Sequence, residues 1–264
     1  MRGPLVLIDS PRLTGADRAA WARLERYDRA LGAAGRMGRL EAQARAAVRE
    51  FAAAGEFYIS TSWGKDSVAA SHTALLEYPG ARVVWVRSRH FEMPGCEQVR
   101  DAFLAMHPEA RYEEIEVVLR NPKRGEPGFD SRHLDPHADH QDVLKEALTG
   151  RYVSGVRAEE SRVRGASIGH RGLVTRNTCR PIGRWEAVDV FAYLCREGLP
   201  VHPAYAMTVG GQLDRRWIRV HPLCSAPPAR SAVYGRDTAW WEDAYFGDAI
   251  AAALAARAGM WGAV

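Results

Sequence analysis

The amino-acid sequence predicts an α/β protein built on a twisted parallel sheet with helices on both faces, a Rossmann-like arrangement. Short apolar runs alternate along the chain with amphipathic stretches of helical period, which is typical of strands connected through helices. The run at 82–87 is apolar enough to be buried on both faces, as in parallel sheets. Around residues 60–67 the order is strand, small-residue loop and helix, the local arrangement that builds phosphate sites.

A helical N-terminal extension is expected over residues 1–54. After an irregular arm at 1–13, Thr14 is placed to cap a helix whose apolar residues recur at helical spacing. A second helix is expected at 39–54, where Gly55 stops it. Three glycines interrupt the helical pattern between the two: Gly32, Gly35 and Gly38.

The sheet domain is expected over residues 55–225, followed by a helical tail over 226–264. Ligands of open parallel sheets bind beyond the carboxyl ends of the strands. The loops that follow the first, second and fourth strands are therefore expected to converge. The predicted strands are 56–60, 82–87, 112–119 and 153–156.

Composition limits the classes of protein to consider. The chain has 264 residues, of which 47% are hydrophobic, as expected for one large globular domain with appendages. It has no apolar run of about 18 residues, so no membrane span is expected. No secretory signal pattern is seen, and four widely separated cysteines do not suggest a disulfide framework. We therefore expect a cytoplasmic protein.

Residues 60–67, Ser-Thr-Ser-Trp-Gly-Lys-Asp-Ser, form the first motif. The Walker phosphate loop requires G-x-x-x-x-G-K-[ST], but Ile59 stands at its first glycine and Asp66 separates Lys65 from Ser67. Small residues still let the backbone approach an anion, and the following helix offers free N–H groups. Ser60, Ser62 and Ser67 offer hydroxyl donors, and Lys65 adds a positive charge. The candidate cofactor-binding residues of this loop are Ser60, Thr61, Ser62, Gly64, Lys65, Asp66 and Ser67.

The second motif opens with Gly155, which permits a close backbone approach after a buried strand. Arg157 and Arg164 then offer guanidinium groups that Glu160 can orient. Seven arginines fall between residues 157 and 184. Because arginine suits phosphate, this density favours an anion-binding wall over the alternative that arginine content reflects only a GC-rich genome.

The third motif is P-I-x-x-W-x-x-x-D-V at 181–190, followed by G-L-P and P-x-Y within 198–205. Together with G-K-D-S at 64–67 and G-x-R-x-x-E-S at 155–161, this motif makes the chain resemble one known family. That is the phosphoadenosine phosphosulfate (PAPS) reductase-like family. That family belongs to the PP-loop ATP pyrophosphatase superfamily, whose fold is the adenine nucleotide alpha hydrolase-like one. The resemblance covers roughly residues 50–225.

The resemblance implies an enzyme that binds ATP and Mg²⁺, cleaves ATP to AMP and pyrophosphate, and adenylates an acceptor. It implies that Asp66 lies near Mg²⁺ or braces the loop. Besides the loop, Gly155 and Arg157 would contact ATP. The adenine would lie at the end of the second strand, near Val86, Arg87 and Ser88. The residues implied in catalysis are Lys65, Asp66, Arg157 and Arg164.

The loop after the second strand departs from the family pattern D-T-G-x-x-F-P-E, because His90 and Glu92 change its chemistry.

The expected acceptor is anionic, and our first specific hypothesis is sulfur transfer to a nucleic acid or nucleotide-like acceptor. Sulfate or sulfonucleotide metabolism is an alternative. Besides ATP and the acceptor, the binding partners considered are a partner protein and a second copy of the chain in a homodimer. The residues expected to bind the acceptor are His90, Glu92, Glu160, Arg176, Cys179 and Arg180.

A second departure is Trp63, which replaces the first glycine of the family loop S-x-G-G-x-D-S. This change leaves open a rival hypothesis, a regulatory subunit that binds nucleotide without turning it over and needs a partner protein. A third departure is that no cysteine follows Cys224. Reduction of a sulfonucleotide by a C-terminal thiol is therefore not expected.

The four cysteines allow two alternatives. An iron–sulfur cluster is not expected, because it would need all of Cys96, Cys179, Cys195 and Cys224, and Cys195 falls on the inward face of a helix. Cys179 either has a pKa lowered by neighbouring arginines and carries sulfur, or is an inert small residue.

Two further segments carry residues of interest. Residues 120–140 are a long polar connection with His133, His137 and His140, either a substrate lid or a divalent-metal site. Residues 240–246 are rich in aromatic side chains, which are expected to pack on the core or a second subunit rather than stack on a base.

Overall fold

The computed structural model describes residues 6–130, 148, 150–224 and 239–261. These residues form two compact units. The first unit comprises Met1–Trp85, Gly95–Glu113 and Gly150–Val220. The second comprises Val86–Pro94, Glu114–Thr149 and His221–Val264.

A five-stranded parallel sheet confirms the predicted α/β class. Its strand order is β4-β3-β2-β5-β6, so β2 is central. The register aligns Ile59 of β2 with Val83 of β3 on one side and Val153 of β5 on the other. All three side chains are buried, as apolar strand runs require. The strands are β2 Tyr58–Thr61, β3 Arg82–Ser88, β4 Arg111–Val117, β5 Tyr152–Val153 and β6 Thr178–Cys179.

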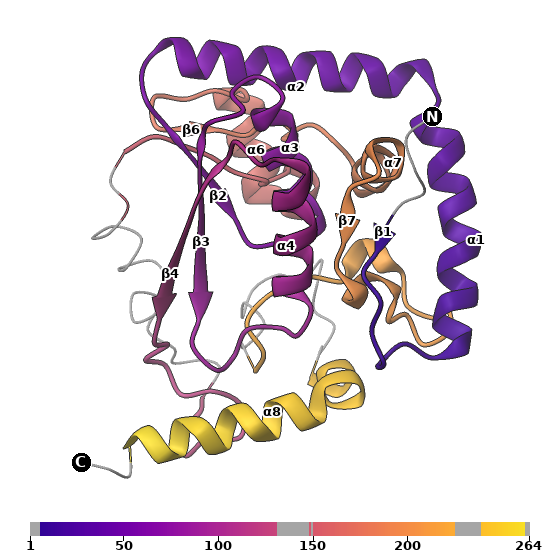
Figure 1. Cartoon of the computed structure of the whole chain (residues 1–264), viewed down its shortest axis with the longest axis vertical. Helices are drawn as coiled ribbons and strands as arrows, with labels where there is room; N and C mark the ends of the chain where they lie inside the picture. The colour runs from indigo at the N-terminus through magenta and orange to yellow at the C-terminus, as the bar shows by residue number, and fades with distance from the viewer. Residues whose placement is uncertain (1–5, 131–147, 149, 225–238, 262–264) are drawn as a thin grey trace. The chain divides into compact units, whose positions relative to one another are not determined.

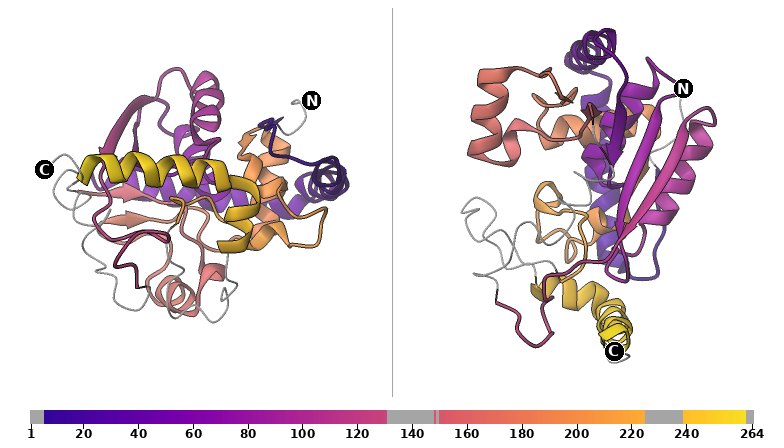
Figure 2. Two further views of the ribbon diagram at one scale, coloured as in Figure 1. Left: turned by 90° about the horizontal axis from the view of Figure 1, so that it is seen from below. Right: turned by 90° about the vertical axis from the view of Figure 1, so that its left-hand side faces the viewer.

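Helices connect the strands and cover the sheet. α3 (Lys65–Leu75) follows β2, and α4 (Cys96–Met106) follows β3. The short helix η1 (Ala158–Glu160) and α6 (Arg162–Arg171) lie between β5 and β6. Figure 2 shows α4 and α6 on opposite faces of the sheet. Ten of the 11 residues of α3 are buried, all except Asp66, which makes α3 a core helix.

Two long helices precede the sheet and belong to the same unit as β2. Thr14 caps α1 (Gly15–Gly32) through a capping box with Asp17, as predicted. α2 (Gly35–Ala53) begins earlier than expected and contains Gly38, so that glycine does not interrupt a helix. α1 lies beside α7 (Ala187–Glu197) (Figure 1).

Four short elements complete the first unit, and the sequence did not predict them. β1 (Val6–Leu7) pairs in parallel with β7 (Pro200–Val201) as a separate two-stranded sheet. The turns η2 (Pro203–Ala206) and η3 (Arg215–Trp217) follow β7. A strand of two residues is too short to show a hydrophobic period.

The second unit is organised around α8 (Ala239–Trp261), which bends at Phe246. Arg124 pairs with Glu242 at 3.0 Å, and Arg257 pairs with Glu126 at 3.0 Å. These contacts tie α8 to the segment that follows β4. Over the described ranges, no helix has both the length and the apolar character that a membrane crossing demands.

Candidate functional site

The loop between β2 and α3 is held by Ser67, the third residue of α3. Its hydroxyl accepts a hydrogen bond from the Ser62 backbone N–H at 3.2 Å and donates to the Gly64 carbonyl at 3.0 Å. Gly64 is the N-cap of α3 and has no side chain to satisfy the first amides of the helix. The helix therefore opens with backbone N–H groups close to a small-residue loop, as an anion site requires.

Trp63 takes the left-handed backbone conformation, with φ at 59°. This conformation costs a non-glycine residue about 1–2 kcal/mol, which explains why a glycine suits the position. Trp63 is fully buried, and removing such a side chain typically costs about 3–5 kcal/mol. Packing therefore outweighs the backbone strain, and the loop is rigid at this residue. The aromatic rings around it are Trp85, Phe103 and Tyr112.

Lys65 points into the protein instead of into solvent, and its side chain is only 3% exposed. Its Nζ atom lies 2.8 Å from Oδ2 of Asp66 and 5.1 Å from the centre of the Tyr205 ring. Burial lowers the pKa of Lys65, while the negative charge of Asp66 opposes that shift.

Asp66 is the link between two motifs that are far apart in the sequence. Its Oδ1 atom accepts a hydrogen bond from Nε of Arg157 at 2.7 Å, while Oδ2 holds Lys65. Burial alone would raise the pKa of Asp66, but the charges of Lys65 and Arg157 outweigh it, so the pKa lies below its ordinary value. Both carboxylate oxygens thus bind cationic side chains, which matches the bracing role.

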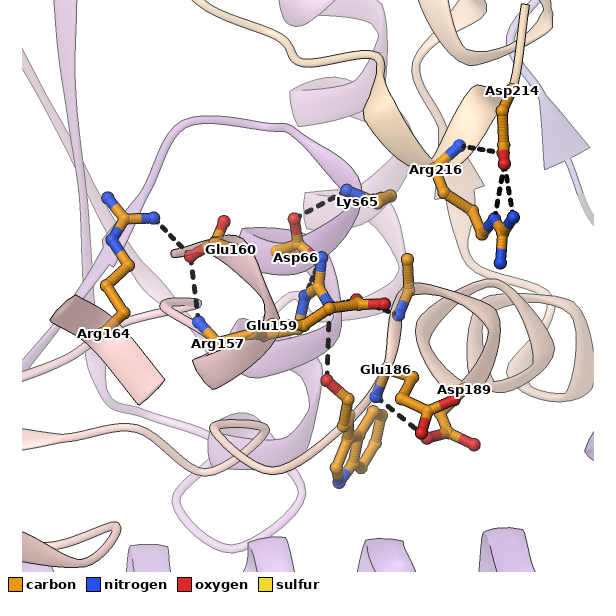
Figure 3. Close-up of polar contacts among 12 residues, drawn as sticks. Lys65, Asp66, Arg157, Glu159, Glu160, Arg164, Glu186, Asp189, Asp214 and Arg216 are labelled. Carbon is orange, nitrogen blue, oxygen red and sulfur yellow. Dashed lines mark hydrogen bonds and ion pairs between the residues drawn. The ribbon is translucent and has the colours of Figure 1, made fainter. Parts of the chain in front are cut away.

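Arg157 is equally buried, at 3% exposure, and extends the network toward the third motif. Its NH1 atom donates to Oε2 of Glu159 at 2.5 Å and to the Trp185 carbonyl at 3.3 Å. Glu159 also accepts from the Ala187 N–H at the start of α7, at 2.7 Å. One guanidinium group therefore joins the loop after β2, the loop after β5 and the third motif (Figure 3).

Glu160 closes the network on its other side. Its carboxylate accepts from the Arg157 backbone N–H at 3.0 Å and pairs with Arg164. Charges alternate from Lys65 through Asp66 and Arg157 to the two glutamates (Figure 3). Such an array orients each guanidinium plane before any ligand binds.

Gly155 allows the two loops to meet. A Cβ atom on this residue would lie 2.6 Å from the carbonyl carbon of Asp66 and 2.8 Å from the Ser67 nitrogen. Both contacts are with backbone, so no other residue fits. The position is also the topological switch point, because β2 has β3 on one side and β5 on the other. Ligands of open α/β sheets bind at this point.

Tyr205 belongs to the site although its role was not predicted. Its hydroxyl accepts a hydrogen bond from the Lys65 backbone N–H at 3.1 Å. A Cβ atom on Gly64 would lie 3.1 Å from the same hydroxyl. The P-x-Y pattern was the only sequence signal, and it gave no hint that the ring reaches the loop.

The predicted arginine wall is divided by the fold. Arg176 precedes β6, and its carbonyl accepts from Nε of Arg151, which precedes β5. Arg176 therefore lies at the amino end of these parallel strands, away from the loop, and does not join the network. Arg180 follows β6 and donates to the Ser167 hydroxyl at 3.3 Å.

Cys179 does not fulfil the expectation of a lowered pKa. It is fully buried within β6, beside Val153 of β5. Burial raises the pKa of its thiol to about 12, because loss of water outweighs the nearby guanidinium of Arg151. The raised pKa favours the second of the two alternatives, that Cys179 is an inert core residue.

The other cysteines, Cys96, Cys195 and Cys224, are buried and unpaired by disulfides. Within the part of the chain that the structure describes, no three histidine, cysteine or carboxylate side chains are grouped to hold a metal ion. The carboxylates of the site bind arginine and lysine, so they do not form a dedicated Mg²⁺ cage. His133, His137 and His140 lie outside the described residues.

The residues expected near the adenine, and two of those expected at the acceptor, His90 and Glu92, fall in the second unit, whereas the other acceptor residues fall in the first. Val86, Arg87 and Ser88 end β3. Glu92 accepts from the Ser88 backbone N–H at 3.0 Å, so it stabilises its own loop. His90, in the same loop, has a left-handed φ of 67°. Their contact with adenine or acceptor stays a prediction.

Comparison of the sequence with protein-family models and with curated proteins found no match. The function is therefore proposed from the residues and their contacts.

Proposed function

We propose that this chain is an ATP-binding enzyme of the PP-loop type. It cleaves ATP to AMP and pyrophosphate and transfers the adenylyl group to an anionic acceptor. The observation that carries the proposal is the Asp66–Arg157 pair, which joins two motifs 91 residues apart. It lies where the strand order reverses, beside the N-terminus of α3.

The residues of the site have distinct roles in this proposal. Backbone amides at the start of α3 and the hydroxyl groups of the loop bind phosphate oxygens. Lys65 and Arg157 supply positive charge where the pyrophosphate leaving group becomes more negative, and Asp66 keeps both in place. Arg164 is held by Glu160 at the edge of this network.

Mg²⁺ is expected to arrive with ATP, because it is usually held by nucleotide phosphates and few carboxylates. When bound, it neutralises phosphate charge. Each oxygen of Asp66 already has one cationic partner, so a metal ion there would share the carboxylate with Lys65 and Arg157. In this proposal Asp66 acts as the brace.

The acceptor is anionic, and a nucleic acid or nucleotide-like molecule that receives sulfur is the favoured class. Arg157 and Arg180 follow the carboxyl ends of β5 and β6, the end of the sheet at which the loop after β2 lies, which supports that charge preference. Sulfate or sulfonucleotide metabolism is the second class. A cytoplasmic location is part of the same proposal.

The reaction is tested with ATP labelled at the α-phosphate, incubated with Mg²⁺ and candidate acceptors. The expected products are labelled AMP, or an adenylylated acceptor, together with pyrophosphate. Release of ADP and inorganic phosphate would overturn the proposal, because it places cleavage at the β–γ bond.

The burial of Lys65 favours a second candidate, a regulatory subunit that binds nucleotide without turnover. Its side chain is 3% exposed, and its charge is already paired with that of Asp66. Nucleotide binding without AMP formation, with every acceptor tested, would favour this candidate.

A further inference from the structure

The hydroxyl of Tyr205 is placed at the first amide of α3. It accepts from the Lys65 N–H at 3.1 Å, and the tyrosine is 2% exposed. A phenol can also donate one hydrogen bond through its own hydrogen. Among the residues that the structure describes, no side chain or carbonyl accepts that hydrogen. A buried donor is therefore available beside the phosphate loop.

The ring cannot turn this hydroxyl elsewhere. It packs against Phe191 of α7, with ring centres 5.6 Å apart, and Nζ of Lys65 lies 5.1 Å from its centre. Before the tyrosine, Nδ1 of His202 accepts from the Ala204 N–H at 3.1 Å and caps η2. The direction of the phenol is thus fixed by packing and by the turn that carries it.

We propose that Tyr205 is a phosphate-binding residue, which accepts from the Lys65 amide and donates its O–H to a phosphate oxygen bound at the loop. This inference rests on the proposed function for the identity of the ligand, a nucleotide polyphosphate. Hydrogen bonds in a chain polarise one another, so the amide strengthens the phenol as a donor. The hydroxyl thereby extends the helix N-terminus toward the anion.

The protonation state agrees with a donor. Burial and the nearby charge of Asp66 raise the pKa of Tyr205, so the hydroxyl keeps its hydrogen at neutral pH. A competing arrangement is that phosphate takes the Lys65 amide and displaces the hydroxyl. The two arrangements predict opposite effects of removing the oxygen.

The test compares Tyr205→Phe with the wild type by calorimetric titration with ATP, pyrophosphate and adenosine. Loss of a hydrogen bond to a charged group should weaken ATP and pyrophosphate binding about 10- to 100-fold. Adenosine affinity should stay the same, because adenosine has no phosphate. Tyr193→Phe is the matched control, since Tyr193 is a fully buried tyrosine of α7 whose ring packs on Trp185.

A second variant preserves the shape of the residue. Tyr205→3-fluorotyrosine makes the hydroxyl more acidic and a stronger donor, so pyrophosphate should bind more tightly. Unchanged or tighter pyrophosphate binding by Tyr205→Phe would overturn the inference, as would a wild-type protein that binds neither ATP nor pyrophosphate.

The proposed function and this inference can fail separately. If the wild type formed AMP and Tyr205→Phe bound pyrophosphate as tightly as the wild type, the proposed enzymatic function would stand. The proposed phosphate contact of Tyr205 would then be rejected. If the wild type formed no AMP but Tyr205→Phe bound pyrophosphate more weakly than the wild type, the phosphate contact would stand. The proposed enzymatic function would then be rejected.

Discussion

The carboxylate of Asp66 pairs with two buried cationic side chains. Loss of the negative charge of Asp66 should therefore lower the free energy of unfolding. Lys65 and Arg157 are each only 3% exposed, so neither can recover its full hydration. Removing one partner of a buried ion pair typically costs about 3–5 kcal/mol, because the other charge stays buried and unpaired. The side chain is thus expected to contribute to stability as well as to binding.

We expect Asp66→Asn to be about 3–5 kcal/mol less stable than the wild type at pH 7. The folded-state pKa of Asp66 is depressed, so its contribution is present above the ordinary pKa and is lost as pH falls through the folded value. The stability difference between the two proteins should therefore narrow below about pH 4. Urea unfolding between pH 7 and pH 2.5 measures it.

Asp214→Asn is the control, because Asp214 pairs with Arg216 near the surface and exposed pairs contribute only about 0–1 kcal/mol. A gap between Asp66→Asn and wild type that stays constant down to pH 2.5 would contradict the assigned role.

At the scale of residues, sequence patterns identified Lys65, Asp66 and Arg157 because each belongs to a local motif. They did not identify the contact of Tyr205 with Lys65, because the two are 140 positions apart and only the fold brings them together. For a related reason, the sequence could not decide between the two alternatives for Cys179. The neighbouring arginines are visible in the sequence, whereas the burial that raises the thiol pKa follows from pairing of β6 with β5.

At the scale of elements, α1 stabilises the segment that follows Tyr205. Oδ1 of the buried Asp17 accepts from the backbone N–H groups of Thr208 and Gly210, at 3.1 and 2.9 Å. Farther along α1, Asp28 pairs with Arg215, whose guanidinium lies 4.0 Å from the centre of the Phe191 ring. The N-terminal extension is therefore part of the support of the site, a role that its amphipathic pattern did not indicate.

We expect Asp17→Ala to destabilise the protein by roughly 3–5 kcal/mol, because it removes the Asp17 half of the capping box and leaves the N–H groups of Thr208 and Gly210 unpaired. Thr14→Ala removes only the cap and should cost about 0.5–2 kcal/mol. The difference between the two variants, measured by urea unfolding, isolates the contacts to residues 208–210. Faster amide exchange at Thr208 and Gly210 should accompany Asp17→Ala alone. Equal stability of the two variants would show that these contacts contribute nothing.

At the scale of the whole molecule, the parallel sheet and the loop at the end of its central strand could be predicted, because long apolar runs and a loop motif are local signals. The order of the strands could not, since it depends on which edges pair in three dimensions. β6, with two residues, extends the sheet beyond β5 and lacks any readable period. The division of the arginines between the two ends of the strands follows from this same pairing.

The loops after β2 and β5 approach each other closely because residue 155 is glycine. Replacing Gly155 therefore tests that close approach. In Gly155→Ala, the new methyl group would meet the backbone of Asp66 and Ser67 at 2.6–2.8 Å, and backbone cannot move aside as a flexible side chain can. Overpacking of this kind costs about 1–3 kcal/mol or more, and the displaced loop should also lose affinity for pyrophosphate.

Gly169→Ala is the matched control for that substitution. Gly169 is an exposed residue of α6 with no atom within 4 Å of an added Cβ, so alanine there should stabilise the helix by about 0.5–1 kcal/mol. Thermal unfolding and pyrophosphate titration on both variants give the comparison. If Gly155→Ala matched the wild type in both measurements, the loops after β2 and β5 would not approach as closely as the structure places them. The shared site at the switch point would then lose its physical basis.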